Sequence, residues 1–320
     1  MRKVVNFILL ILVLQFANAQ KIEKYFDFQW RETSSEYAMF YGVWEKVDSL
    51  WHRKDYYIYQ KSLQMEGFFK DEACKVHHGK FTHYYSNGNV ESTSNYQNNS
   101  KEGVFISYHP NGMIKDSAFY RNDKMIGMSA AWYPSGNIMY ERMLDTMGNQ
   151  SGIFVDYFDN EKISYKGRWG KDFIKTGTWT YYHNNGNKAQ NVVYVNDTSK
   201  QVICYDTSGV QQETCELADT PAQFRGGGGS ISLTKYIEKR VYWPSDYKFT
   251  NQGKATVTIR FTIDETGKVK NPFVLRGFHP AFDKIALQIF IGMPNWSPAI
   301  HHNRTVEQNF IQSISFTSPE

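Results

Sequence analysis

Three cysteines are the first side chains of this sequence that could carry chemistry. Cys204 and Cys215 lie eleven positions apart, and a disulfide between them is possible in an oxidising compartment, which would leave Cys74 free. The spacing alone leaves both a disulfide and two separate thiols open. No C-x-x-C spacing of the kind that binds zinc is present.

Two adjacent histidine pairs, His77-His78 and His301-His302, are the next candidates, in this case for metal binding. Neighbouring residues on a strand point to opposite faces, so an adjacent pair rarely holds one ion. No H-E-x-x-H spacing accompanies either pair. We therefore expect solvated loop histidines and no metal site.

The glycine run 226–229 invites comparison with a phosphate-binding loop. It lacks the Lys-Ser/Thr that such a loop needs, and no suitable strand precedes it. We interpret it as a hinge or turn leading into the last part of the chain. No G-x-S-x-G, carboxylate pair or local Cys/His arrangement stands out, so we expect no catalytic residues, no cofactor and a non-enzymatic protein. A site assembled in space from distant residues remains an alternative.

The amino end has the pattern of a signal peptide over residues 1–19. Arg2-Lys3 form a basic start, Val4–Phe16 an apolar stretch, and small residues up to Ala19 a cleavage site. The competing interpretation is a retained anchor, but the stretch is shorter than the roughly 18 residues that span a membrane, and Asn6 interrupts it. Without Arg2 and Lys3, the basic residues nearly balance the 32 acidic ones, which does not indicate nucleic-acid binding.

Residues from about 51 to 215 repeat with a period of 24 or 25. The repeat is marked by a glycine, an aromatic residue five positions later, and usually an Asn-Gly or Ser-Gly pair that ends nine positions after the first glycine. The marker glycines are Gly79, Gly103, Gly127, Gly152 and Gly177, and the aromatics are Tyr84, Tyr108, Trp132, Tyr157 and Tyr182.

Each repeat is predicted to be one β-hairpin, because Asn-Gly supplies residues that tolerate the positive φ of a tight turn. The fourth copy departs, with Asn160-Glu161 in place of the pair. Two weaker copies flank the set, so seven units would form a meandering sheet that resembles an array of MORN-type repeats. That resemblance implies a scaffold or interaction surface, although most individual aromatics are expected to be core.

Residues 20–50 lack a clean period. We interpret them as an N-terminal capping segment whose aromatics are buried against the first repeats. These aromatics are Trp30, Tyr37, Phe40, Tyr41 and Trp44. A linker is expected at 216–222, between the repeats and the last domain.

The stretch Gly253–Phe316 has clear periods of its own. Residues 255–263 alternate apolar with polar, a turn follows, and Val269–Leu275 can return as the second arm of a hairpin. Apolar residues from Phe282 to Phe290 fall on one helical stripe that begins near Pro280. A last strand is expected over Val306–Phe316. One helix on a small sheet predicts an α+β domain, and the chain as a whole is predicted to be mainly β.

At these residues the sequence resembles the C-terminal domain of the TonB energy-transducer family, over residues 223–317. The resemblance rests on GKATVTIRFTIDETGKV, the helix, MPNWSPAIHHNRTV and the final strand, with FRGG and SLTKYIEKRVYWP upstream. It implies a domain in the periplasm of a Gram-negative bacterium. That domain would bind a protein partner, such as a segment of an outer-membrane receptor, by adding the partner's strand to its sheet edge.

Carried over by position, the resemblance implies two groups of partner-binding residues. The family more often has Tyr directly before the proline, where Trp243 stands here. Trp296, in the family's turn, is interpreted as core. The implied contacts are Tyr242, Trp243 and Pro244 near the receptor, and Val306, Gln308, Phe310, Gln312 and Ile314 on the edge strand.

Three functions follow from this organisation. A cleaved chain would be a periplasmic binding protein, because an energy transducer needs a membrane helix and a long spacer, often rich in proline. This chain has nine prolines, none of them in a run. A retained amino end would make it a membrane-anchored transducer with the repeats as spacer. The third function is an antitoxin-like protein or an enzyme with its site on the repeat sheet.

Overall fold

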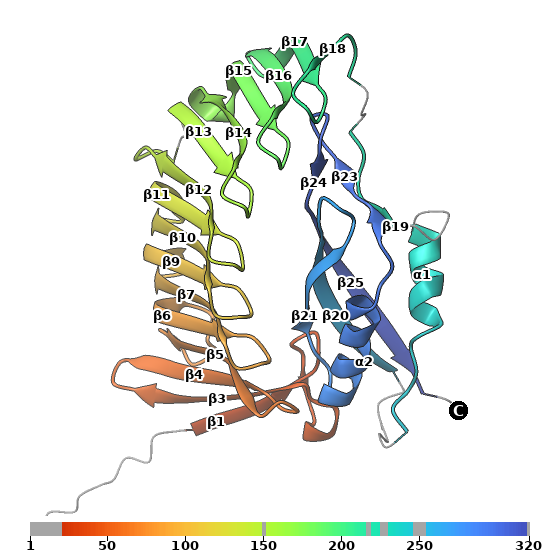
Figure 1. The fold of residues 1–320 in the computed structure, drawn as a ribbon. Helices are drawn as coiled ribbons and strands as arrows, with labels where there is room; N and C mark the ends of the chain where they lie inside the picture. Colours follow the sequence, from red (N-terminus) through yellow and green to blue (C-terminus); the bar gives the residue numbers. More distant parts are fainter. Residues whose placement is uncertain (1–20, 149–151, 216–218, 225–229, 246–253, 319–320) are drawn as a thin grey trace, which may run out of the picture.

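The computed structural model describes residues 21–148, 152–215, 219–224, 230–245 and 254–318. They form one long antiparallel sheet of 18 strands, followed by a small domain of two helices and a three-stranded sheet (Figure 1). The prediction of a mainly β chain is confirmed. The predicted signal peptide and the glycine run 226–229 lie outside the described residues.

The long sheet, which we call the repeat array, is a meander of hairpins. Most strands pair antiparallel with the next strand along the chain, β7 also pairs with β9, and β1 pairs with β3. The strands are β1 (Lys21–Phe26), β2 (Glu32–Thr33), β3 (Phe40–Val47), β4 (Leu50–Tyr57), β5 (Ser62–Phe69), β6 (His77–Tyr84), β7 (Val90–Gln97), β8 (Ser100–Lys101), β9 (Gly103–Tyr108), β10 (Ile114–Arg121), β11 (Lys124–Trp132), β12 (Ile138–Leu144), β13 (Gly152–Tyr157), β14 (Ile163–Trp169), β15 (Lys175–Tyr182), β16 (Lys188–Val195), β17 (Thr198–Tyr205) and β18 (Gln211–Gln212). Two short 3-10 helices, Ser35–Tyr37 and Lys171–Phe173, interrupt it.

The turns explain the spacing of the repeats. Gly112 and Gly186 adopt φ values of 88° and 94°, which only glycine adopts without strain. In the fourth copy Glu161 takes the same conformation, with φ 64°. The fourth copy therefore keeps the hairpin turn although its sequence differs, and a residue with a side chain adopts left-handed backbone angles there.

Hydrogen bonds between successive turns hold the hairpins in register. The Tyr85 hydroxyl donates to the carbonyl of Tyr108 over 2.7 Å, and the Tyr133 hydroxyl donates to that of Tyr157 over 2.8 Å. Asn111 Nδ2 donates to the carbonyl of Pro134 in the same way. Each turn thus satisfies a carbonyl of the next turn, which fixes the spacing between repeats.

The residues before the repeats belong to the same sheet, beginning with β1. Trp44 is buried with Trp51, as expected of a cap. Trp30 and Tyr37 are instead 41% and 38% exposed, so the expectation that all five aromatics of this segment are buried is wrong. Trp30 stacks on Phe40 with ring centroids 4.2 Å apart.

The last domain, which we call the terminal domain, comprises β19 to β25 with both helices. Its central strand β20 (Lys254–Ile263) pairs with β21 (Val269–Arg276) on one side and β25 (Gln308–Thr317) on the other. The remaining elements are β19 (Gln223–Phe224), α1 (Ser230–Glu238), α2 (Pro280–Ile291), β22 (Trp296–Ser297), β23 (Ala299–Ile300) and β24 (Thr305–Val306).

The core of the terminal domain lies between α2 and one face of the sheet. The predicted helix stripe, Phe282 to Phe290, and the alternate residues of β20 are all buried, as their periods indicate. Met39, from the start of the repeat array, is buried in the same core. No helix among the described residues is long and apolar enough to cross a membrane.

The repeat array is curved, and the terminal domain lies along its inner side and contacts both ends (Figure 1). Near the beginning of the array, Gln60 Nε2 donates to Asp283, and the ring of Tyr59 lies 5.7 Å from that of Phe278. Near its end, the turn between β23 and β24 enters the last repeats. The chain is therefore closed on itself.

Candidate functional site

Strand β25 is an edge of the terminal sheet, as predicted for the last strand. Among the described residues it pairs only with β20, so every second backbone N–H and C=O along it points away from the sheet. The opposite edge, β21, contains Pro272, which has no N–H, and Asn271 with φ 47°. A proline and an irregular backbone make β21 a poor template for another strand, whereas β25 is regular over ten residues.

The edge begins later than predicted. Val306 belongs to β24, where it pairs with Ala299, and β25 starts at Gln308. The assignment of Val306 to the edge strand is wrong, because the alternation of apolar residues continues across Glu307 although the pairing changes there.

The side chains of the other predicted edge residues turn towards the helices. Gln308 Oε1 accepts from the backbone N–H of Ala222 over 2.7 Å, and Phe310 stacks on Phe261 with ring centroids 5.5 Å apart. Ile314 is fully buried. Gln312 is half-buried, and its amide donates to a backbone carbonyl of its own strand. These side chains hold the edge in place from the side of the helices.

The face of β25 that points away from the helices carries a second row, Asn309, Ile311, Ser313, Ser315 and Thr317. Ile311 is 63% exposed, which is unusual for an isoleucine on a strand. The side chains of this row are not among the contacts predicted from the sequence, although Ile311 and Ser313 lie on the predicted edge strand. The signal for this row in the sequence is that its mostly polar residues alternate with the apolar residues of the same strand.

Tyr242, Trp243 and Pro244 lie near the far end of the edge strand. Tyr242 is 60% exposed, whereas the ring of Trp243 meets that of Phe282 edge-on at 4.9 Å. Phe282 also contacts Phe316 of β25, at 5.1 Å. The structure thus brings this segment and the edge strand to the same part of the core, with Pro244 half-buried and Tyr242 directed outward. Trp296 is buried, as expected of a core residue.

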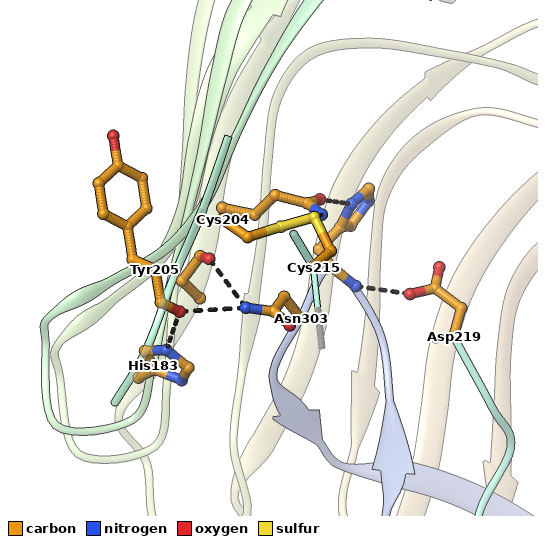
Figure 2. The surroundings of a disulfide bond; sticks show 9 residues. His183, Cys204, Tyr205, Cys215, Asp219 and Asn303 are labelled. Atoms are coloured by element: carbon orange, nitrogen blue, oxygen red, sulfur yellow. Dashed lines mark hydrogen bonds between the residues drawn. A yellow bond between two sulfur atoms is a disulfide. The ribbon is translucent and has the colours of Figure 1, made fainter. Parts of the chain in front are cut away.

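The turn between β23 and β24 joins the terminal domain to the repeats. Arg304 is buried, and its guanidinium donates to the carbonyl of Ser164 over 2.5 Å and to that of Tyr182 over 2.7 Å. Burial lowers the pKa of Arg304 to about 10, which leaves it charged at neutral pH. Asn303 Nδ2 donates to the carbonyl of Tyr205, which His183 also contacts (Figure 2).

A disulfide between Cys204 and Cys215 lies beside this turn (Figure 2). Of the two possibilities that the spacing left open, a disulfide or two separate thiols, the structure has the disulfide. Gln190 contacts the disulfide sulfurs through its amide nitrogen, and its Oε1 lies 2.7 Å from Nδ1 of His302. Cys74 is free, and burial raises the pKa of its thiol to about 11, so it is a poor nucleophile at neutral pH.

Of the two histidine pairs, His301 is an exposed loop residue as expected, whereas His77, His78 and His302 are not solvated loop residues. His302 stacks on Tyr181 with ring centroids 3.6 Å apart, and burial lowers its pKa to about 3. His77 lies in β6 and contacts Phe81 and the side chain of Asn99. The sequence could not show this, because the partners of His302 lie more than a hundred residues away. Within the described part of the chain, no three His, Cys, Asp or Glu side chains gather to hold a metal ion.

Comparison with known families agrees with this geometry. Residues 244–317 match the family described as Gram-negative bacterial TonB protein C-terminal. Residues 78–98, 101–122 and 175–196 match the MORN repeat variant. No curated protein matches the chain. The chain therefore combines repeats of the MORN variant with a domain of the Gram-negative bacterial TonB C-terminal family.

Proposed function

We propose that this protein is a non-enzymatic binding protein of the periplasm that captures an extended segment of a protein partner by strand addition at β25. The observation that carries the proposal is the regular edge of β25, which pairs with β20 on one side and with no described strand on the other. The match to the TonB C-terminal family supports a protein partner in the Gram-negative envelope, with a segment of an outer-membrane receptor as the first candidate.

The two edges of the terminal sheet differ in a way that favours β25. Pro272 interrupts the donors of β21, and the ring of Phe273 on that strand lies 5.8 Å from Tyr85 of the repeats. An incoming strand would have to displace this contact. The outward face of β25 instead presents Ile311 and small polar side chains, which an added strand can cover.

The repeat array acts in this proposal as a rigid scaffold. It contacts the terminal domain at both ends, through Gln60 and through Arg304, and so holds the sheet at a fixed distance from the array. Intact mass of the protein from soluble and membrane fractions tests the location. A soluble species that begins near Gln20 is expected, and a membrane species that retains Met1 would favour an anchored transducer.

Strand addition is tested with a labelled ten-residue peptide from the amino-terminal segment of an outer-membrane receptor. Successive N–H groups along β25 point alternately towards β20 and away from it. Of the two variants Ile311→Pro and Gln312→Pro, one therefore removes an N–H that points away from β20, where an added strand would bind. We expect that variant to fold and to lose at least about ten-fold in affinity, since a central main-chain bond is lost.

The control lies in the peptide. Two methylated peptides are compared, one with methyl groups on the odd-numbered peptide nitrogens and one with them on the even-numbered nitrogens. One of the two should lose binding and the other should keep it, because only one set of N–H groups faces β25. Equal binding by both methylated peptides, or unchanged affinity in both folded proline variants, would exclude strand addition at this edge. Ile311→Thr, which keeps the backbone donors, should bind with little change.

A further inference from the structure

A cavity of about 390 Å³ lies between the turns of the repeat array and the terminal sheet. One wall comes from consecutive repeats and includes Tyr85, His109, Trp132 and Tyr140. The other comes from the terminal domain and includes Arg260 and Phe273. The size is that of pockets that hold small organic molecules, and neither part of the chain encloses the space alone.

The aromatic wall is fixed in orientation. The Tyr85 hydroxyl donates to the carbonyl of Tyr108, and Nε2 of His109 lies 2.8 Å from the carbonyl of Trp132. Burial lowers the pKa of His109, which keeps its ring neutral at neutral pH. With their polar atoms bonded to the backbone, these side chains offer ring surfaces to an occupant.

The charged groups of the cavity are paired, with one exception. Lys270 Nζ lies 3.0 Å from Glu307, and Lys115 Nζ lies 3.3 Å from Asp116. Asp159, which also lines the cavity, accepts a hydrogen bond from the hydroxyl of Ser135. Arg260 is half-buried and has no ion pair or hydrogen bond from its side chain to any described residue. A guanidinium is a planar fork of donors that matches a carboxylate in a two-bond geometry, and an apolar surrounding strengthens that pairing.

We propose that this cavity binds a small organic monocarboxylate with a ring-sized apolar body, whose carboxylate pairs with Arg260 and whose ring lies against the aromatic wall. Asp116, Asp159 and Glu307 line the same space, so a dianion such as a phosphate monoester meets more repulsion than a monoanion. The cavity lies over one face of β20 and β21 and also touches β25 through the side of Asn309. The proposal does not depend on strand addition, because its ligand contacts are Arg260 and the aromatic wall and not the outward backbone groups of β25.

The test uses the full-length protein and calorimetric titration with four probes: benzoate, phenylacetate, cyclohexanecarboxylate and indole-3-acetate. At least one acid is expected to bind, and its carboxamide, which has the same ring and no charge, to bind at least about ten-fold more weakly. Phenyl phosphate should bind more weakly than the acid. Failure of all four acids at 10 mM, or equal affinity of acid and amide, would overturn the proposal.

Variants locate the site. Arg260→Gln should remove the preference for the acid over the amide, and Arg260→Lys, which keeps the charge without the fork, should retain part of it. Arg276→Gln is the matched control, because Arg276 lies on β21, is exposed, and does not line the cavity. An equal loss in Arg260→Gln and Arg276→Gln, with both folded by circular dichroism, would show a general charge effect and no site.

Discussion

Single glycines in the middle of strands set the packing of the largest rings in the repeat array. A Cβ on Gly167 would lie 2.1 Å from the ring of Trp179, and one on Gly67 would lie 2.3 Å from that of Phe81. Trp179 and Phe81 are both almost fully buried. The missing side chain on one strand therefore makes room for the ring on the next.

Gly167→Ala is expected to destabilise the protein by about 1–3 kcal/mol, the usual cost of forcing extra volume into a packed core. The measurement is the free energy of unfolding in urea. Gly292→Ala is the control, since φ there is −103° and nothing lies within 4 Å of an added Cβ. A similar loss in both variants would mean that the ring of Trp179 moves aside at little cost.

For single residues, the sequence predicts the local backbone conformation better than it predicts which side chains are in contact. The spacing of glycine and Asn-Gly residues predicts the hairpins, because positive φ is a local requirement. The spacing does not predict that His302 stacks on Tyr181, or that Arg260 and Tyr140 line the same cavity. Those neighbours are set by how the whole chain closes, which no local pattern contains.

The disulfide acts at the scale of an element, because it joins the end of β17 to the segment that follows the short strand β18. Cys204 is buried, and Gln190 and His302 lie next to it. The bond therefore supports the surface of the array that receives the terminal domain.

Replacing both Cys204 and Cys215 by serine is expected to cost about 3 kcal/mol, because a closed loop of this length restricts the unfolded chain by that amount. Urea unfolding measures the loss, and hydrogen exchange should rise first in β17 and β18. Cys74→Ser, which removes a thiol outside the disulfide, is the comparison. If the double variant unfolds at the same urea concentration as Cys74→Ser, the bond contributes nothing to stability.

The elements of the terminal domain were predicted well where their periods are long. The ten residues of β20 alternate cleanly, and α2 begins at Pro280 and ends before Gly292 as its stripe indicates. The pairs β19–β22 and β23–β24 have two residues in each strand, too few for any period to show. The start of β25 was misplaced for the same reason, since β24 adjoins it directly.

On the scale of the molecule, the protein is an arc closed by its terminal domain. Arg304 is the most deeply buried charge in that closure, and it satisfies two carbonyls of different repeats. Phe158 of the array lies beneath its guanidinium, at 5.2 Å. Loss of this one side chain therefore removes several contacts between the two parts at once.

Arg304→Ala should weaken the contact between the terminal domain and the end of the repeat array by about 2–4 kcal/mol, because the buried carbonyls of Ser164 and Tyr182 lose their donor. Hydrogen exchange is expected to rise at residues 299–306 and in β15, while the core strand β20 stays protected. Arg276→Ala, at an exposed position, should change neither. Unchanged exchange in Arg304→Ala would mean that the remaining contacts are sufficient to keep the arc closed.

The burial of Met39 in the core of the terminal domain also sets the order in which the chain can fold. Each hairpin pairs residues close in sequence and can form quickly, as soon as both of its strands have been synthesised. Met39 meets its partners only after roughly 200 further residues have been made, and closing so long a loop is slow. The arc therefore forms first, and the domain that spans it is completed in a late step that needs both ends of the chain.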